Sequence, residues 1–135
     1  MNNIEKFKEM GIRIRKERDE YRASSELWRL RERARTLKTR KAKEKAWDKF
    51  ETAFKAKFPD GAVVWIDEGI QFDRFRADSF VTYKPMQVVI RHNTGHGIYF
   101  DGLEYDRVEV FYDPCGHDNL MALELAQLNK EAVAS

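Results

Sequence analysis

The chain has 135 residues, of which 42% are hydrophobic and 36% charged, and this is typical of one folded, highly charged domain. Its longest aliphatic and aromatic run, residues 62–66, is far shorter than the roughly 20 residues that span a bilayer, and its single cysteine excludes an intrachain disulfide. The opening sequence MNNIEKFKEM lacks the apolar core of a signal peptide, so we expect a cytoplasmic protein without a membrane anchor.

The net charge of +2 conceals two halves of opposite sign. Residues 1–58 hold 19 basic and 10 acidic side chains, whereas residues 59–135 hold 6 basic and 13 acidic ones. Such asymmetry predicts a basic helical region over 1–58 and an acidic region of antiparallel sheet with a C-terminal helix over 59–135, within one compact unit. Mutual neutralisation of the halves, within the molecule or in a dimer, is the alternative interpretation.

Residues 1–22 are predicted to form an amphipathic helix, which Asn2 or Asn3 would cap. Its apolar residues recur every three or four positions. They are Ile4, Phe7, Met10, Ile14 and Tyr21. Ser24 and Ser25 then interrupt the pattern, so either serine could cap a second helix, and a turn there would allow a hairpin.

A second helical region is predicted from about residue 26 to 58, where Pro59 and Gly61 end it. It carries two apolar seams, each spaced for one helical face. The first consists of Leu27, Leu30, Ala34 and Leu37, and the second of Trp47, Phe50, Phe54 and Phe58. A break with Thr39 as cap is conceivable between them, but a basic first turn would oppose the helix dipole. We therefore expect one long or kinked helix.

The stretch 29–45 is the most unusual part of the chain, because it carries nine cations against two anions, Glu32 and Glu44. The cations are Arg29, Arg31, Arg33, Arg35, Lys38, Arg40, Lys41, Lys43 and Lys45. Like charge at this density repels itself unless counterions or a polyanion neutralise it. Arginine also matches phosphate geometry through two parallel hydrogen bonds.

After residue 61 the pattern becomes extended, and short segments are separated by turn residues. The segments are 62–66, 70–76, 80–83, 86–91, 98–100, 103–105 and 107–112. Residues 62–66, apolar on both faces, predict a central strand. A final helix capped by Asp118 or Asn119 carries four leucines, so the fold class is α+β with an antiparallel meander of about five strands.

The histidines and the cysteine are the only candidates for soft metal ligands. They are His92, His96, Cys115 and His117. Their spacing matches no usual structural zinc pattern, so we expect no metal, although the sequence leaves zinc binding by these four residues open. Cys115 lies two residues from His117, which is weak support for a catalytic nucleophile.

Pro59 and Asp60 match the first half of a metal-dependent nuclease signature, but the second half of the chain contains no acid-x-Lys element. No phosphate-binding glycine loop is present either. We therefore expect a protein that is not an enzyme and that requires no cofactor.

The sequence leads to one hypothesis for function and one alternative. The hypothesis is non-catalytic binding of nucleic acid or a nucleoprotein complex through the nine cations. The alternative is a small protein-binding inhibitor or adaptor, of a kind that a mobile element could encode, which blocks a nucleic-acid-processing enzyme by charge complementarity or by mimicking nucleic acid. The mimicry would use Asp101, Glu104, Asp106, Glu109 and Asp113. RNA, DNA and protein all remain open as the partner, as does dimerisation.

Overall fold

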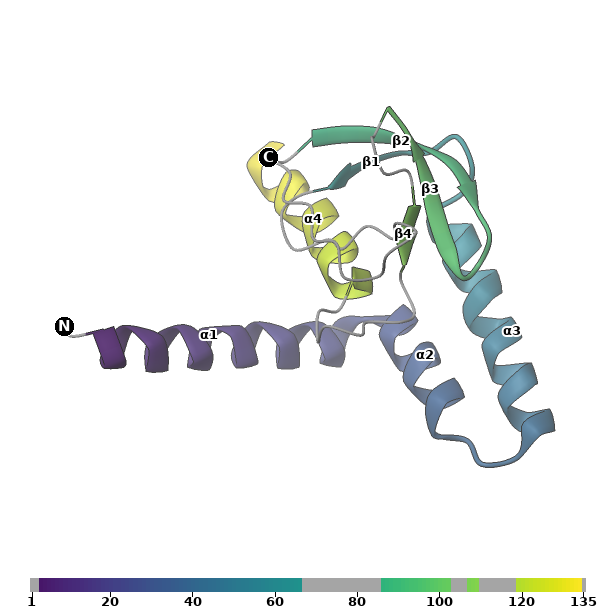
Figure 1. Cartoon of the computed structure of the whole chain (residues 1–135), viewed down its shortest axis with the longest axis horizontal. Helices are drawn as coiled ribbons and strands as arrows, with labels where there is room; N and C mark the ends of the chain where they lie inside the picture. Colours follow the sequence, from purple (N-terminus) through teal and green to yellow (C-terminus); the bar gives the residue numbers. More distant parts are fainter. Residues whose placement is uncertain (1–2, 67–85, 103–106, 110–118, 135) are drawn as a thin grey trace.

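The computed structural model describes residues 3–66, 86–102, 107–109 and 119–134 (Figure 1). In chain order the elements are α1 (Asn3–Ser24), α2 (Glu26–Thr36), α3 (Arg40–Lys57), β1 (Val63–Ile66), β2 (Met86–Asn93), β3 (Gly97–Asp101), β4 (Arg107–Glu109) and α4 (Asn119–Ala134). This arrangement confirms the α+β class and the C-terminal helix. Among the described helices, none combines the length and the apolar character that a bilayer crossing requires.

The four described strands form one antiparallel sheet in the order β1-β2-β3-β4. The prediction of about five strands is close, but segments 70–76, 80–83 and 103–105 lie outside the described residues. Among the four described strands, 62–66 is not central as predicted, because β1 lies at the end of their order and Val63 is 55% exposed.

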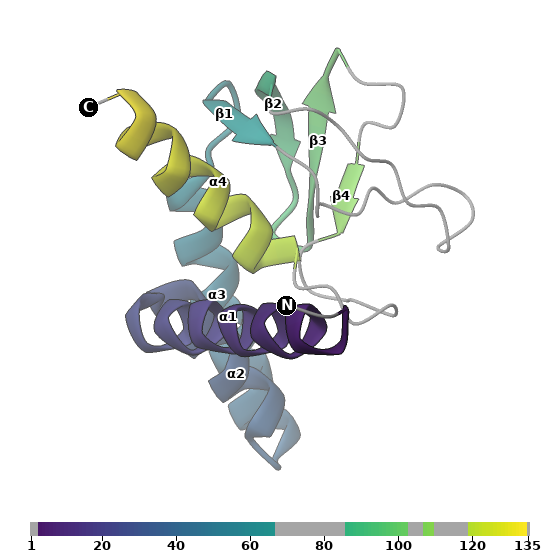
Figure 2. The ribbon, with the colours of Figure 1, turned by 90° about the vertical axis from the view of Figure 1, so that its left-hand side faces the viewer.

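The free edge of β1 is covered by one side chain of α4. The Gln127 amide donates to the backbone oxygen of Trp65 at 2.8 Å, and its oxygen accepts from the Trp65 backbone N–H at 2.9 Å. The same amide nitrogen also donates to the Leu123 carbonyl at 2.7 Å, which fixes it to its own helix. Figure 2 shows α4 running beside β1. The exposed edge is thus blocked by a helix, as sheet edges commonly are.

The core lies between one face of the sheet and the helices α3 and α4. Alternate strand residues contribute to it, as the two-residue period of a strand requires. From the sheet these are Val64, Ile66, Val88, Ile90, Ile98, Phe100 and Val108. The aromatic seam of α3 meets them, with the Phe50 and Phe54 rings stacked at 5.6 Å between centroids. Three residues of the predicted second seam, Phe50, Phe54 and Phe58, are buried in this core, and Trp47 is partly buried against it.

A β-bulge interrupts the alternation in β2. Ile90 pairs with Phe100 and His92 with Tyr99, so Arg91 is the extra residue. Because of this extra residue, the next inward side chain is Asn93, which is only 3% exposed, while His92 faces solvent.

The long helix expected over 26–58 is wrong, because α2 and α3 form a hairpin (Figure 1). Leu37 and Thr39 are extended, and the Thr39 hydroxyl accepts a hydrogen bond from the Ala42 N–H at 3.3 Å. The unfavourable dipole costs about 0.3–1 kcal/mol per cation, whereas each large apolar side chain buried by folding back contributes about 1.5–3 kcal/mol. Burial of Leu27 and Phe50 therefore outweighs the dipole.

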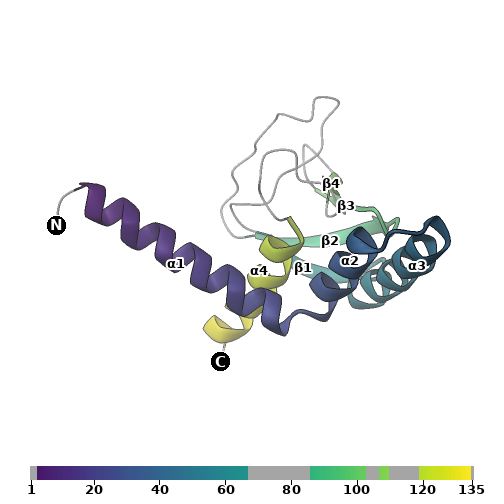
Figure 3. The same cartoon turned by 90° about the horizontal axis from the view of Figure 1, so that it is seen from below.

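Helix α1 follows a different course from the other helices. Ser25 caps α2 by accepting from the Trp28 N–H at 3.0 Å, which confirms one of the two predicted cap residues. Figures 1 and 3 show α1 running out to one side of the body, so it does not fold back on α2 as an antiparallel pair. At its inner end Tyr21 is buried, while near its N-terminus Ile4 is 67% exposed.

Candidate nucleic-acid interface

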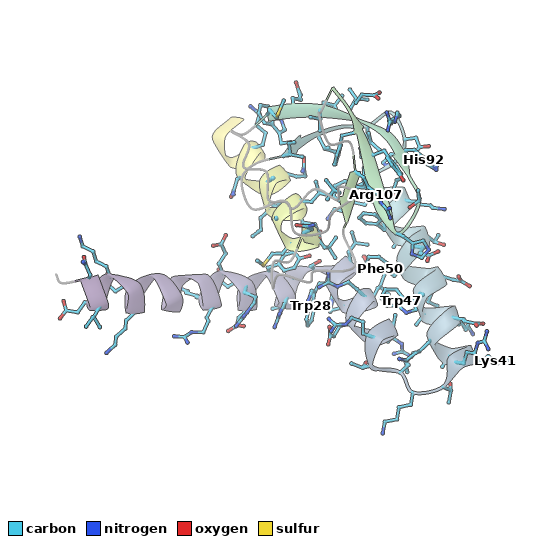
Figure 4. The ribbon with its side chains drawn as sticks, viewed as in Figure 1. Trp28, Lys41, Trp47, Phe50, His92 and Arg107 are labelled. Carbon is cyan, nitrogen blue, oxygen red and sulfur yellow. The ribbon has the colours of Figure 1, made fainter. Side chains whose placement is uncertain are left out.

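The hairpin brings the nine predicted cations together at the end of the molecule away from the sheet. Four lie in α2, Lys38 lies in the connection, and four lie in the first two turns of α3. Figure 4 shows Lys41 close to the tip, far from His92 on the sheet. The turn at Leu37 to Thr39 therefore converts a linear run of charge into a compact cationic end.

The nine cations differ in exposure. Seven are exposed, namely Arg29, Arg33, Arg35, Lys38, Arg40, Lys41 and Lys45. Lys43 is half-buried, and Arg31 is only 6% exposed because its position on α2 faces the buried side of the helix. A group covered to that degree is not accessible to a phosphate, so Arg31 is left out of the candidate interface.

Only two of the exposed cations are neutralised by acids within the hairpin. Arg35 Nη1 lies 3.5 Å from Glu32 Oε2, and Arg40 Nε lies 3.1 Å from Glu44 Oε1. Six others form no ion pair with any carboxylate in the described part of the chain. They are Arg29, Arg33, Lys38, Lys41, Lys43 and Lys45.

Three acids of the second half have partners elsewhere in the molecule. Asp101 Oδ1 lies 3.8 Å from Arg91 Nη1, Asp60 binds His92, and Glu124 pairs with Lys57 near the end of α3. None of these pairs involves the stretch 29–45, so these three acids do not neutralise the hairpin.

Two of the five acids predicted for the alternative function are described. Asp101 is exposed at the end of β3, and Glu109 ends β4 opposite Gly97. The other three, Glu104, Asp106 and Asp113, lie outside the described residues.

The two described histidines each bind a separate carboxylate. His92 Nδ1 lies 2.9 Å from Asp60 Oδ2, and His96 Nε2 lies 2.9 Å from Glu51 Oε1. No group of three possible ligands that could hold a metal ion occurs among the residues with described positions, and Cys115 and His117 fall outside them.

Asp60 serves the fold through both of its oxygens. Besides the His92 contact, its Oδ1 accepts the Asn93 backbone N–H at 2.7 Å. The hydrogen bond from His92, then that from the Asn93 amide, lower the pKa of Asp60 below its usual value because both stabilise the ionised form. The residue that matched half of a nuclease signature therefore joins the end of α3 to β2.

Asn93 is a structural residue that the sequence did not single out. Its buried amide donates to the Phe58 carbonyl at 2.9 Å and to the Phe54 carbonyl at 3.4 Å, while its oxygen accepts from the Gly95 N–H at 2.8 Å. It thereby supplies a donor to the Phe58 carbonyl at the C-cap of α3, whereas the Phe54 carbonyl also accepts the Phe58 backbone N–H at 3.0 Å. An Asn followed by Thr and Gly indicates a turn, but only the bulge turns this side chain inward.

A second unforeseen cluster surrounds Glu124 of α4, which is 6% exposed. Its Oε1 accepts hydrogen bonds from the hydroxyls of Tyr21 at 2.6 Å and Ser25 at 2.7 Å, and its Oε2 pairs with Lys57. Four helical segments therefore meet at one carboxylate. The separations in sequence are 103, 99 and 67 residues, so no local pattern could reveal it.

Comparison with known protein families finds no matching family model, and searches of curated proteins and of solved structures find no significant match.

Proposed function

We propose that this protein binds nucleic acid, alone or within a nucleoprotein complex, through the α2–α3 hairpin and without catalysing a reaction. The observation that supports the proposal is the set of six cations without a carboxylate partner among the described residues, five of them exposed.

The energetics of the hairpin favour a polyanionic partner. Arg29 and Arg33, like Lys41 and Lys45, stand four residues apart on one helix, and such like-charge pairs destabilise a helix by about 0.2–0.5 kcal/mol each. Residues four apart on a helix are separated by about 6 Å along its axis, less than the Debye length of about 10 Å at 0.1 M salt, so these charges interact. A phosphate backbone relieves this repulsion and gains free energy by releasing its own condensed counterions.

The expected mode of binding is contact with phosphates and not with base edges. The sequence contains no zinc-finger spacing, RNP-like aromatic signature or GxxG loop. Contacts from lysine and arginine to phosphate position a protein on nucleic acid and carry no sequence information. We therefore propose affinity that varies little between nucleic-acid sequences.

A salt titration tests the proposal. For duplex DNA the plot of log affinity against log salt concentration should fall with a slope of about −0.9 for each phosphate contacted, giving roughly −5 if six cations take part. The double variant Lys41→Glu with Lys45→Glu should abolish most of this affinity. Lys8→Glu with Arg15→Glu, two exposed positions on α1, changes the net charge equally and serves as the control.

Two results would contradict nucleic-acid binding at the hairpin. One is an affinity independent of salt, and the other is an equal loss of binding in the α1 control. A pull-down from lysate with and without nuclease treatment distinguishes nucleic-acid binding from the alternative function, because a partner retained after nuclease treatment is bound through protein contact.

A further inference from the structure

We infer that the phosphate backbone lies on one particular face of the hairpin, the face that carries Arg29, Arg33, Lys45 and Lys49. Lys49 is a contact residue on this face that falls outside the charged stretch 29–45. The inference rests on the proposed function and adds to it the orientation of the bound nucleic acid.

The two flanks of α2 differ in charge pairing. Leu27 and Ala34 mark its buried stripe. At 100° per residue, Glu32 and Arg35 fall on one flank of this stripe, where they form their ion pair. Arg29 and Arg33 fall on the other flank, and both are exposed.

The same division holds for α3, whose buried stripe is Ala46, Phe50 and Phe54. Arg40 and Glu44, which form the second ion pair, lie on one flank. Lys45 and Lys49 lie on the opposite flank, and both are exposed, without an ion pair to any carboxylate of the described segments.

The hairpin geometry places the ion-paired flanks of α2 and α3 on the same face of the pair, and their unpaired flanks on the opposite face. Two antiparallel helices that pack through their buried stripes are related by a two-fold axis perpendicular to the plane of the pair, so corresponding flanks face the same side. Both ion pairs therefore share one face, and the four unpaired cations share the other. Two exposed acids border this second face, Glu26 at the start of α2 and Asp48 three residues after Lys45 on α3, and neither forms an ion pair with these four cations.

This unpaired face fits a phosphodiester backbone. Arg29 and Arg33 on α2, and Lys45 and Lys49 on α3, are each separated by one helical turn, about 6 Å along the axis. The helix axes of a packed pair stand about 8–10 Å apart, so the cations form two short parallel rows. On the other face a phosphate would have to compete with Glu32 and Glu44, whose carboxylates also repel it.

Matched double variants of the full chain test the choice of face. Arg29→Gln with Arg33→Gln should weaken binding of a duplex DNA at least about tenfold near 0.1 M salt and make the salt slope shallower by about 2. Arg35→Gln with Arg40→Gln removes the same charge from the same hairpin and should weaken binding less than about threefold. Lys49→Gln alone should make the slope shallower by about 1.

The outcomes separate this inference from the function on which it rests. Equal weakening by both double variants, with a salt-dependent wild type, overturns the choice of face while hairpin binding stands. An unchanged slope in Lys49→Gln removes that residue from the interface. A wild type whose affinity does not respond to salt overturns the proposed function itself. All five substituted side chains are exposed, and circular dichroism would verify that every variant retains its helices.

Discussion

Asp60 shows how one residue can be given opposite roles by sequence and by structure. Next to Pro59 it suggests half of a catalytic signature, yet both of its oxygens are used to attach β2 to the end of α3. The lowered pKa of Asp60 arises from these hydrogen bonds and not from any bound substrate. A shifted carboxyl pKa is in this case a consequence of structural hydrogen bonds, just as structural ion-pair networks often shift pKa values.

Replacing Asp60 with Asn should make stability less dependent on pH in the acid range. A carboxyl group whose pKa is lowered by folding stabilises the native state above its unfolded pKa, about 3.9 for Asp, and loses this effect as pH falls through the lower folded value. The free energy of unfolding, measured with urea between about pH 2 and 5, should therefore converge for wild type and Asp60→Asn at the acid end of this range.

The control for this experiment is Asp48→Asn, which removes an exposed carboxylate that accepts no hydrogen bond from another described residue. Its stability curve should stay parallel to that of the wild type. A difference between Asp60→Asn and wild type that stays constant down to the lowest pH would show that the hydrogen bonds do not favour the ionised form.

At the scale of elements, the hairpin of α2 and α3 decides where the charge lies. The sequence contained both apolar seams and the correct cap, Thr39, but the dipole argument favoured a continuous helix. The prediction was wrong because it included the unfavourable helix dipole at the basic first turn of α3 but not the burial of apolar side chains, which stabilises the hairpin by more. Leu27 and Phe50 belong to one core cluster, and the chain must reverse between them for both to be buried in it.

The cap at Thr39 can be tested by substitution. Thr39→Ala should destabilise the protein by about 1 kcal/mol, because the Ala42 N–H loses its acceptor while four cations crowd the same end of the helix. Chemical denaturation gives the free energy, and amide hydrogen exchange at Ala42 should report faster local opening.

Thr36→Ala provides the matched comparison on the same turn. The Thr36 hydroxyl donates to the Glu32 carbonyl at 3.0 Å within α2, and this kind of bond adds little to a helix. Equal losses in the two alanine variants would mean that the cap contributes nothing specific to the break.

The elements predicted from sequence are those with local signals. The three- and four-residue spacing gave the helical faces, and turn residues delimited β2, β3 and the start of α4 at Asn119. The bulge at Arg91 and the inward turn of Asn93 had no such signal, because an extra residue in a strand is fixed by its partner and the core below it. Among the candidate site residues, charge alone did not distinguish the buried Arg31 from its exposed neighbours.

At the scale of the whole molecule, Glu124 connects parts of the chain that share few other polar contacts. Tyr21 lies near the C-terminal end of α1, Ser25 caps α2 and Lys57 ends α3, and all three bind this carboxylate. It lies in a helix otherwise rich in leucine and alanine, and no local pattern in that helix predicts an acid in the interior. Contacts between residues this far apart in the sequence form only when the helices pack against one another.

Removal of this carboxylate should weaken the whole fold. Glu124→Ala removes the carboxylate that accepts from the buried hydroxyls of Tyr21 and Ser25, and each hydrogen bond to a charged group contributes about 1.5–3 kcal/mol. We expect a loss of at least about 2 kcal/mol in the free energy of unfolding, measured by urea denaturation.

Glu44→Ala is the reference variant, because it deletes an exposed ion pair worth about 0–1 kcal/mol. If Glu124→Ala proved no more destabilising than Glu44→Ala, the buried cluster would be incidental to stability.

The contact between Gln127 and Trp65 also determines how the sheet can grow. A glutamine amide offers one donor and one acceptor in the same arrangement as a peptide group, so it imitates one residue of a fifth strand. Any other polypeptide segment that approached this margin in extended form would first have to displace that amide from the backbone. The assembly of β1 with foreign chains is thereby opposed by a side chain that its own C-terminal helix supplies.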